Sequence, residues 1–588
     1  MTEPKPSLGQ RARALLPDLS AATATLFLGV PQGLAYATIA GLPPAMGLFA
    51  STLPTIVGSL FRSSKHVVVG PTNALSLLVG GAVIALSDHD PMQVGIALAL
   101  GVAVFQLVAT ALRLSAVVDY ISSPTVLGYI TGAGLLIGLG QLHNLTATTG
   151  PKGKLWVAIP GWIEALPRAH MPSLIFAGAT LVAAVVLRML SRRIDRKLPV
   201  ALLVMLAGTA ISWGFGLEAR GLVVIADLAP IPAGFPPLTL PSLELTVQLA
   251  PAALACAMLS LVESNAVARS VAARSGQRLD TNREFLGQGL ANLTAAFFAG
   301  YPVSGSLTRS ALNEQSGAQS RASGVLTGLL MIVVLMAAAP VLDRTPIASL
   351  AGLLLVVAWD LVDIPQIRRT MKASRGDAIA FVVTLLATWT LDLDKAIYLG
   401  VVSSVVLFLR KARLLTIREL VVNEDGVLQE IALDAPLGKL RRCSAIRLIH
   451  IEGALFFGSA GELRRAIEEL ATTPGVQVII IRIKRASGLD MTAVETLATL
   501  AEAMRERKQR LLLVGMTVPT MELFARSGAV ARIGEDALFP TQKRWFAALE
   551  AAKQKAFTLV DHHSEDCGLD HARPFVITGD GDGVTQDD

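Results

Sequence analysis

The sequence predicts a polytopic α-helical membrane protein that ends in a small α/β domain. Of its 588 residues, 52% are apolar and 16% are charged, with a mean hydropathy of +0.56. Soluble domains carry about 25% charged residues, so this composition excludes a chain of ordinary water-soluble domains. Apolar runs of about 20 residues, the length that crosses a bilayer, recur from residue 19 to residue 412. The residues after them alternate short β-rich runs with amphipathic helical patterns.

Charge differs between the two parts of the chain. Residues 1–418 carry 31 Lys and Arg against 20 Asp and Glu, whereas residues 419–588 carry 20 against 25. The basic excess belongs to loops that flank membrane segments, so no nucleic-acid partner is expected. The three cysteines lie far apart without a CxxC spacing, which predicts neither disulfides nor a zinc site.

Composition divides the chain into four parts. Residues 1–18 form a cytoplasmic amino terminus, 19–418 a transmembrane domain, and 419–560 the α/β domain. Residues 561–588 contain eight acids and one Arg, which predicts a disordered acidic tail. Metal binding by His562, His563 and Cys567 of this tail is the alternative.

Fourteen apolar segments are bounded by Gly, Pro or charged residues. They cover residues 19–40, 45–61, 71–87, 91–112, 123–140, 172–190, 199–214, 247–268, 281–298, 306–318, 322–339, 347–366, 377–391 and 395–412. Segments 71–87 and 306–318 are short and polar for full spans. With a cytoplasmic amino terminus, however, 24 basic residues lie in inner loops and six in outer loops, and omitting a short segment destroys this asymmetry. The even count places the α/β domain in the cytoplasm.

Two charged residues fall inside the predicted membrane segments. Glu263 lies within segment 247–268, and Arg309 lies within the short segment 306–318. An intramembrane charge is costly unless it is paired or hydrated, so such residues commonly mark an ion or substrate path. Snorkelling to the membrane interface is the alternative, and it suits the long Arg309 side chain better than Glu263.

The two short segments share one design. In each, an extended stretch, Val67–Val69 or Tyr301–Val303, leads through Gly70-Pro71 or Ser304-Gly305 into a helix of small residues. They are the third and the tenth of fourteen segments, so each is third in a set of seven, and such repeats are inverted in the membrane. Half-helix amino termini that meet near the midplane favour an anion through their N–H groups and dipoles. Kinks tolerated for packing are the alternative.

The remaining motifs indicate no catalysis. Gly132, Gly134 and Gly138 form a GxG-like run within an apolar span, and no acidic residue follows, so close helix packing is expected in place of dinucleotide binding. There is no Walker A motif, and no nucleophile, base and orienting group stand together in the α/β domain. We therefore expect no enzyme activity, cofactor or metal.

The α/β domain has clear predicted elements. Strands are expected at 447–451, 476–483 and 510–515, and helices at 460–471, 491–507 and 519–528. Asp490 is a helix cap that leaves Thr492 exposed in the first turn, which makes both residues candidates for a regulatory site. Ordinary capping is the alternative.

Several motifs resemble those of the SulP family of anion transporters, the sulfate permeases and their relatives. They are Pro31–Ala37, Gly41–Pro44, Gly47–Phe49, Gly70–Ala74, Glu263–Ser264, Gly289–Asn292 and Gly305–Asn313. The carboxy-terminal part resembles a STAS domain, with Leu489–Val494 in the loop where some relatives are phosphorylated. Met491 before Thr492 departs from the form with two serines. The resemblance covers nearly the whole chain.

The resemblance implies a seven-plus-seven inverted repeat in which a core domain (helices 1–4 and 8–11) moves against a gate domain (helices 5–7 and 12–14), within a homodimer. The implied anion-binding residues are Gln32, Tyr36, Thr72, Asn73, Ser306, Leu307, Thr308 and Arg309. Glu263 falls where coupled members keep an acidic residue. Val267 stands one turn later, where a sodium-coupled relative offers a hydroxyl, which favours a proton over sodium.

The leading hypothesis is proton-coupled transport of a small anion by elevator-like alternating access, in the lipid of a bacterial inner membrane. Sulfate, bicarbonate, chloride and dicarboxylates all remain open as substrates. The alternatives are an uncoupled exchanger or channel-like conductor, and a membrane-tethered signalling platform whose output is the STAS domain.

Overall fold

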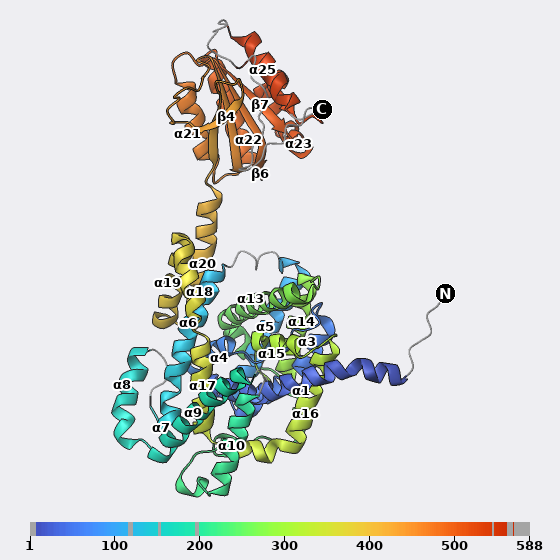
Figure 1. The fold of residues 1–588 in the computed structure, drawn as a ribbon, viewed down its shortest axis with the longest axis vertical. Coiled ribbons are helices and arrows are strands. Elements are labelled where there is room, and N and C mark those ends of the chain that lie inside the picture. The colour runs from blue at the N-terminus through green and yellow to red at the C-terminus, as the bar shows by residue number, and fades with distance from the viewer. Residues whose placement is uncertain are drawn as a thin grey trace. The chain divides into compact units, whose positions relative to one another are not determined.

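A computed structural model describes residues 8–115, 122–150, 155–194, 199–543, 546–560 and 569. The chain forms two compact units, Met1–Val405 and Val406–Asp588. The first is a bundle of helices, and the second is built on a six-stranded sheet (Figure 1). Of the predicted tail, only Leu569 is described, and it is buried in the core of the second unit. His562, His563 and Cys567 lie outside the described residues.

Helices occupy all fourteen predicted apolar segments. They are α1 (Leu8–Ile39), α2 (Pro44–Phe49) with α3 (Leu53–Phe61), α4 (Asn73–Ala85), α5 (Pro91–Ala111), α6 (Ser123–Gly140), α9 (Met171–Arg193), α10 (Val200–Gly214), α13 (Ala250–Ser275), α14 (Thr281–Phe297), α15 (Leu307–Gln315), α16 (Ala322–Asp343), α17 (Ile347–Asp360), α19 (Arg375–Thr390) and α20 (Leu393–Ala412). Among the described residues, seven helical stretches are long and apolar enough to cross a membrane, while α4 and α10 are apolar but shorter.

Further short helices connect these segments. They are α7 (Leu142–Thr146), α8 (Leu155–Ala165), α11 (Ile225–Leu228), α12 (Leu243–Gln248) and α18 (Ile364–Ala373). Local chemistry explains several helix starts, because the caps satisfy N–H groups that lack intrahelical partners. Asp90 caps α5 by accepting from the Met92 N–H at 3.2 Å, and Asp280 caps α14 by accepting from the Asn282 N–H at 3.0 Å.

The helices of the first unit pack in two groups. Helices α1, α3–α5 and α13–α16 contact one another in one group, and α6, α9, α17 and α19 do so in the other. Close approach explains the glycines of α6. A Cβ at Gly132 would lie 2.8 Å from the Cβ of Thr388 on α19, and one at Gly134 would lie 3.0 Å from the carbonyl oxygen of Ala358 on α17. These glycines therefore serve helix packing, as predicted.

The second unit contains the sheet β4-β3-β5-β6-β7-β8. Its parallel strands are β5 (Ile446–Ala454), β6 (Val478–Ser487), β7 (Arg510–Met516) and β8 (Leu538–Pro540), and β3 (Thr416–Val422) and β4 (Leu428–Ala432) extend it antiparallel. The helices are α21 (Ala460–Ala471), α22 (Met491–Glu506), α23 (Val518–Arg526), α24 (Ala529–Ile533) and α25 (Ala547–Leu559). Strands β5–β7 and helices α21–α23 match the predicted elements to within a few residues.

Five of these strands and helices are absent from the sequence prediction, namely β3, β4, β8, α24 and α25. Strands β3 and β4 form a hairpin rich in charged residues, and β8 has three residues, so none shows a clear hydrophobic alternation. Glu419 of β3 is nevertheless buried, because Arg447 and Arg442 each approach one of its carboxylate oxygens to 2.7 Å. Helix α25 packs on β6, β7 and β8 and completes the core.

Candidate functional site

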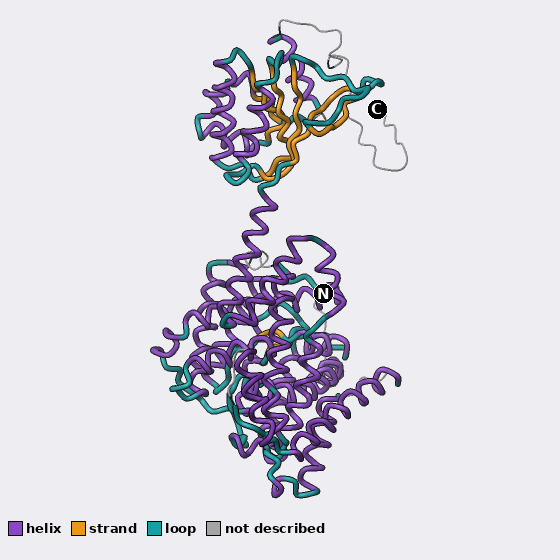
Figure 2. The backbone as a smooth tube through the Cα atoms, turned by 90° about the vertical axis from the view of Figure 1, so that its left-hand side faces the viewer, coloured by secondary structure: helices purple, strands orange, loops and turns teal. Residues whose placement is uncertain are grey.

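The two short segments form the half-helices α4 and α15, and a pair of short strands directly before them joins the two. Strand β1 (Val69–Gly70) pairs antiparallel with β2 (Ser304–Gly305), and Figure 2 shows this pair enclosed by helices. The pairing continues into the next helix, because the Ser306 N–H donates to the Val68 carbonyl at 3.0 Å. Both strands begin later than the predicted extended stretches, Val67–Val69 and Tyr301–Val303, and each strand includes a glycine. The amino termini of α4 and α15 consequently lie side by side.

At the amino terminus of α4, Thr72 occupies the cap position but makes no side-chain cap. Its hydroxyl donates instead to Glu263 Oε2 at 3.0 Å, which links α4 to α13. The Asn73 side chain turns back on its own helix, and its Oδ1 accepts from the Ala74 N–H at 2.7 Å. First-turn N–H groups have no intrahelical partner, so α4 presents donors at this point.

At the amino terminus of α15, the side chains face in two directions. Leu307 is 52% exposed and Thr308 is also exposed, whereas Arg309 is 2% exposed. Ser306 Oγ accepts from the Arg309 N–H at 3.4 Å, and the Thr308 hydroxyl accepts from Gln32 Nε2 of α1 at 3.4 Å. The start of this half-helix is therefore accessible, while its charged residue points into the protein.

Arg309 lies between the two half-helices. Its Nη2 donates to the carbonyl oxygen of Pro71, and its Nε has no hydrogen-bond partner. The guanidinium also packs over Gly70, where an added Cβ would lie 2.4 Å from Nη1. Gly70 has φ +158°, which other residues rarely adopt. Among the described residues, no carboxylate oxygen lies within 4.0 Å of Arg309, so none of them forms an ion pair with this buried cation.

The remaining predicted residues lie around this centre. Gln32 is buried, and its Oε1 has no hydrogen-bond partner. Tyr36, one turn further along α1, packs against Leu354 of α17, so it lies where the two groups of helices meet. The structure thus brings together Gln32 with Thr308 and Thr72 with Glu263, whereas the side chains of Tyr36, Asn73 and Leu307 make no hydrogen bond to another predicted site residue in the described part of the chain.

A buried polar network holds the backbone that leads into β2. The Val303 carbonyl oxygen accepts from Gln288 Nε2 at 2.7 Å, from Asn292 Nδ2 at 3.2 Å and from Ser260 Oγ at 3.0 Å. The Val303 N–H donates to Asn292 Oδ1 at 2.8 Å, so Asn292 pairs with this residue as a neighbouring strand would. Gln106 Oε1 accepts from Asn292 Nδ2 at 2.9 Å. This network was not predicted from the sequence. Its signal was the pair Gln288 and Asn292, two polar residues four positions apart in a predicted apolar segment.

Replacing Asn292 with alanine is expected to lower both stability and anion affinity. The change leaves the buried Val303 N–H without its partner, and such a loss costs about 1–3 kcal/mol. It also frees the strand that positions the α15 amino terminus. Thermal unfolding with and without added anion measures both effects. Asn144→Ala, on the short helix α7, is the matched control, and an unchanged anion affinity in Asn292→Ala would contradict the positioning role.

A buried ion pair braces the same group of helices. Arg62, at the end of α3, is fully buried, with its Nη1 3.6 Å from Glu284 Oε2 of α14. Glu284 Oε1 also accepts from the Ser63 and Ser64 N–H groups at 2.8 and 2.6 Å. Arg62 follows the predicted segment 45–61 and is one of the basic residues assigned to inner loops, whereas Arg309 falls inside a predicted segment. Arg62 is equally buried, and it differs because the chain supplies its carboxylate.

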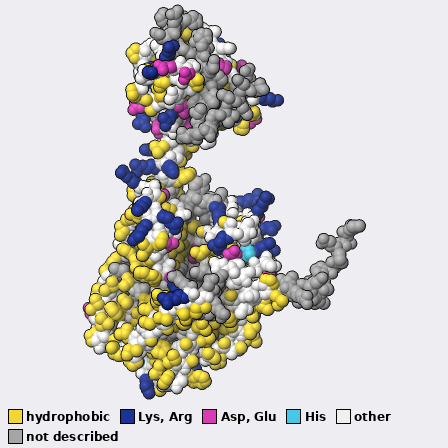
Figure 3. Space-filling model, in the orientation of Figure 1, with side chains coloured by type: hydrophobic (Ala, Val, Ile, Leu, Met, Phe, Trp, Pro, Cys, Tyr) yellow, Lys and Arg dark blue, Asp and Glu magenta, His cyan; other side chains and the backbone are white. Residues whose placement is uncertain are grey.

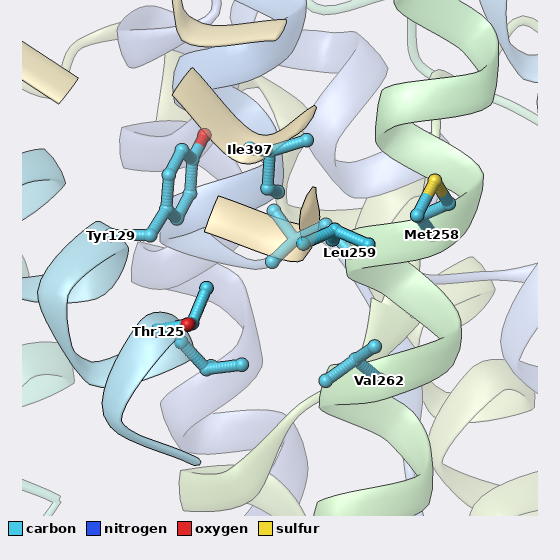
Figure 4. A pocket seen from close by; sticks show the side chains of 8 residues that line it. Thr125, Tyr129, Met258, Leu259, Val262 and Ile397 are labelled. Carbon is cyan, nitrogen blue, oxygen red and sulfur yellow. The ribbon is translucent and has the colours of Figure 1, made fainter. Parts of the chain in front are cut away.

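Helix α13, which carries Glu263, faces α6 and α20 across an apolar pocket. Figure 4 shows Thr125 and Tyr129 of α6 on one side and Met258, Leu259 and Val262 of α13 on the other. Ile397 and Val401 of α20 and Val126 of α6 complete the lining. The lining apart from Thr125 and Tyr129 is aliphatic or thioether, so few polar bonds tie α13 to α6 and α20 here.

In the second unit, Asp490 is a bridging cap. Its Oδ1 accepts from the Ala493 N–H at 2.8 Å, and its Oδ2 accepts from the Phe457 N–H at 2.8 Å. Asp490 therefore fastens the loop after β5 to the first turn of α22, and both of its oxygens are engaged. Thr492 is exposed in that turn. Asp490 is the predicted cap, and a regulatory role for Asp490 and Thr492 stays a prediction.

Replacing Asp490 with alanine is expected to loosen the first turn of α22. Loss of an N-cap of this kind costs about 1 kcal/mol. Hydrogen exchange at the Ala493 and Phe457 amides should accelerate in the variant, because both lose their acceptor. Asp434→Ala, outside any helix or strand, is the control. Unchanged exchange at both amides would contradict the bridging role.

Comparisons with known proteins agree with this architecture. The Sulfate permease family profile matches residues 15–384, and the STAS domain profile matches residues 440–544. Solute carrier family 26 member 6 of Homo sapiens is 30% identical over an alignment of 417 residues that covers 67% of this chain and 54% of the human protein. Putative sulfate transporter YvdB of Bacillus subtilis (strain 168) is 27% identical over 525 residues, which are 89% of this chain and 95% of that protein.

Solved structures show the same fold. The murine Slc26a9 anion transporter in its inward-facing state superposes with a TM-score of 0.81 at 21% identity, covering 92% of each chain. The transmembrane domain of a cyanobacterial bicarbonate transporter, BicA, gives a TM-score of 0.58 at 21% identity, covering 67% of this chain and 98% of that one.

The membrane-length helices, the paired half-helices and the α/β domain define a helical membrane transporter with a carboxy-terminal STAS domain. The chain belongs to the Sulfate permease family, and it is an anion transporter of the SulP and SLC26 kind.

Proposed function

We propose that this protein carries a small anion across the membrane, with the anion held between the amino termini of α4 and α15. The observation that supports this most strongly is Arg309, a buried cation with no carboxylate within 4.0 Å among the described residues and a free Nε. A buried charge without a partner is unfavourable, and a bound anion would supply that partner. Half-helix N–H groups add donors on two sides.

Residues that converge on this point would bind the anion together. The proposed set is Gln32, Tyr36, Thr72, Asn73, Ser306, Leu307, Thr308 and Arg309. Gln32 and Thr308 are already hydrogen-bonded to each other, and the Gln32 amide keeps an unpaired oxygen. The Leu307 and Thr308 positions give access from outside the protein. Backbone and hydroxyl donors of this kind select negative charge before they select a particular anion.

The names of two relatives match two of the expected substrates. The Bacillus relative is named a putative sulfate transporter, and the cyanobacterial one a bicarbonate transporter. Sulfate, bicarbonate, chloride and dicarboxylates are therefore the anions to test. Uptake of each into proteoliposomes, with the others as competitors, tests the proposal. Failure of all four to enter or to compete would overturn it.

Coupling to a proton is the second part of the proposal. Glu263 accepts from Thr72 at the proposed binding point, and among the described residues no basic group lies within 4.0 Å of it. Protonation of this carboxylate would change the charge next to the anion, which links the two bindings. Sodium fits less well, because Val267, one turn along α13, packs with Val67, Ala268 and Val271 and offers no oxygen.

Elevator-like alternating access completes the proposed mechanism. The group containing α1, α4, α13 and α15 would move as a core against a gate containing α6, α9, α17 and α19, over surfaces such as the apolar pocket beside α13. This proposal includes fourteen spans in a seven-plus-seven inverted repeat and a homodimer. It places residues 1–18 and the STAS domain (419–560) in the cytoplasm of a bacterial inner membrane, with 19–418 as the transport domain and 561–588 as a tail.

Two alternatives differ in what they require. An uncoupled exchanger or channel-like conductor needs no proton gradient, so electrical recording with reversed ion and pH gradients separates it from symport. A signalling platform would use the STAS domain, with Asp490 and Thr492, as its output, and flux that persists after deletion of 420–588 would argue against it.

A further inference from the structure

Helix α18 (Ile364–Ala373) is an amphipathic basic helix that joins two apolar helices of the membrane unit, α17 and α19. Asp363 caps it by accepting from the Gln366 N–H at 2.9 Å, and Ser374 ends it and caps α19. Its apolar residues Ile364, Ile367 and Met371 follow helical spacing and share one face. Its basic residues, Arg368, Arg369 and Lys372, lie beside that face, and Arg375 follows at the start of α19.

No residue of α18 is buried by the rest of the chain. Ile364 is 41% exposed and Met371 is 46% exposed, and Arg368, Arg369, Lys372 and Arg375 are all exposed. A short helix with an uncovered apolar face is unstable in water by itself, so something outside the described residues should cover it.

The basic side chains of α18 differ from several others in the first unit. Elsewhere in the first unit, Arg188 pairs with Asp360 at 2.7 Å, Arg274 with Glu314 at 3.3 Å and Arg283 with Asp280 at 3.7 Å, and Arg321 donates to two backbone carbonyls. Among the described residues, no carboxylate lies within 4.0 Å of Arg368, Arg369, Lys372 or Arg375. The nearby carboxylates of Asp360 and Asp363 are engaged with Arg188 and with the α18 cap.

We propose that α18 binds the headgroups of anionic phospholipids at the membrane surface. Helix α17 begins a stretch, Ile347–Ala373, that is long and apolar enough to cross a membrane, and α19 occupies the predicted apolar segment 377–391. A basic helix between two such elements would lie at the boundary between lipid and water. There, Ile364, Ile367 and Met371 can enter the acyl region while the basic side chains reach phosphates. Figure 3 shows that Lys and Arg side chains gather towards one end of the membrane unit, while hydrophobic side chains cover most of its face.

An anionic lipid surface fits α18 better than an acidic protein segment does. Carboxylates could pair with the arginines, but they would leave Ile364 and Met371 uncovered. A bilayer supplies both the negative charge and the apolar phase, and each basic residue near such a surface adds to the binding. Lipid bound here would hold one helix hairpin of the proposed gate at a fixed depth, so transport should depend on the anionic lipid content.

The test uses the full chain and a neutralised variant, Arg368→Gln/Arg369→Gln/Lys372→Gln. Cardiolipin or phosphatidylglycerol added to the detergent-purified protein should raise the Tm of the wild type by several degrees and that of the variant by much less. Phosphatidylcholine should act equally on both. The control Arg274→Gln/Arg278→Gln/Arg283→Gln removes the same charge from the end of α13, the loop that follows it and the start of α14, and it should keep the wild-type response. Arg368→Lys/Arg369→Lys should also keep it, because the charge remains.

Three outcomes would overturn the proposal. An equal anionic-lipid response in the neutralised variant would show that the lipid binds elsewhere. The same loss in the control variant would show a general effect of charge. An effect of inorganic phosphate equal to that of the lipids would show an anion site without a membrane role. The expected dependence of transport on anionic lipid rests on the proposed function, whereas the lipid-induced rise in Tm does not. If the protein transports none of the tested anions, the Tm measurement therefore still tests lipid binding.

Discussion

Replacing Arg309 with alanine is expected to raise the dissociation constant for the transported anion by about 10- to 100-fold. This range corresponds to the loss of one charge-assisted hydrogen bond, about 1.5–3 kcal/mol. Arg309 is 2% exposed and has no carboxylate partner among the described residues, so its charge is available to a ligand. The anion-dependent shift in Tm of the purified protein measures the affinity directly. It requires no transport, so it separates binding from coupling.

Two further variants sharpen this prediction. Gly70→Ala should weaken binding in a similar way, because its Cβ would lie 2.4 Å from Arg309 Nη1 and the guanidinium would have to move. Arg283→Ala, an exposed arginine on α14, should bind the anion normally. If Arg309→Ala keeps wild-type affinity while it remains folded, the proposed anion site is wrong.

Replacing Glu263 with glutamine is expected to abolish the response of uptake to a pH gradient. Glutamine keeps the acceptor oxygen for Thr72, which is 3.0 Å from the carboxylate, but it cannot gain or lose a proton. Uptake should fall to the level measured without a gradient, while anion binding by Tm shift persists. Proteoliposomes with an imposed inward proton gradient provide the measurement.

Glu244→Gln, on the exposed helix α12, is the matched control for this change and should retain pH-driven uptake. Full pH-driven uptake by Glu263→Gln would remove Glu263 from the coupling mechanism. Wild-type uptake that does not change with the pH gradient would support the uncoupled exchanger instead.

Local patterns in the sequence were sufficient for much of the fold. Long apolar runs predicted the membrane helices, and the sequence Gly-Pro or Ser-Gly after an extended stretch predicted where α4 and α15 begin. Arg309 and Glu263 stood out because charged residues are rare in such runs. In the second unit, the buried strands β5, β6 and β7 were visible as β-branched runs.

Features that depend on distant contacts were not predictable in this way. The partners Arg62 and Glu284 are more than two hundred residues apart, and nothing local indicates that they meet. Asn292 and Val303 are close in sequence, but only the folded chain shows that the side chain replaces a strand. Strands β3 and β4 carry charges such as Glu419, whose burial depends on Arg442 and Arg447.

The hydrogen bonds between β1 and β2 have a thermodynamic consequence. Because the two half-helices are tied to each other through Val69–Gly305 and Gly70–Ser304, the proposed anion site between them cannot open by separating its halves. Under the proposed elevator motion it would travel intact, with the same intrinsic affinity for the anion on either side of the membrane. Such a site cannot favour one direction of transport by binding the anion more weakly on one side of the membrane. Any net accumulation must then come from the ion that moves with the anion or in exchange for it.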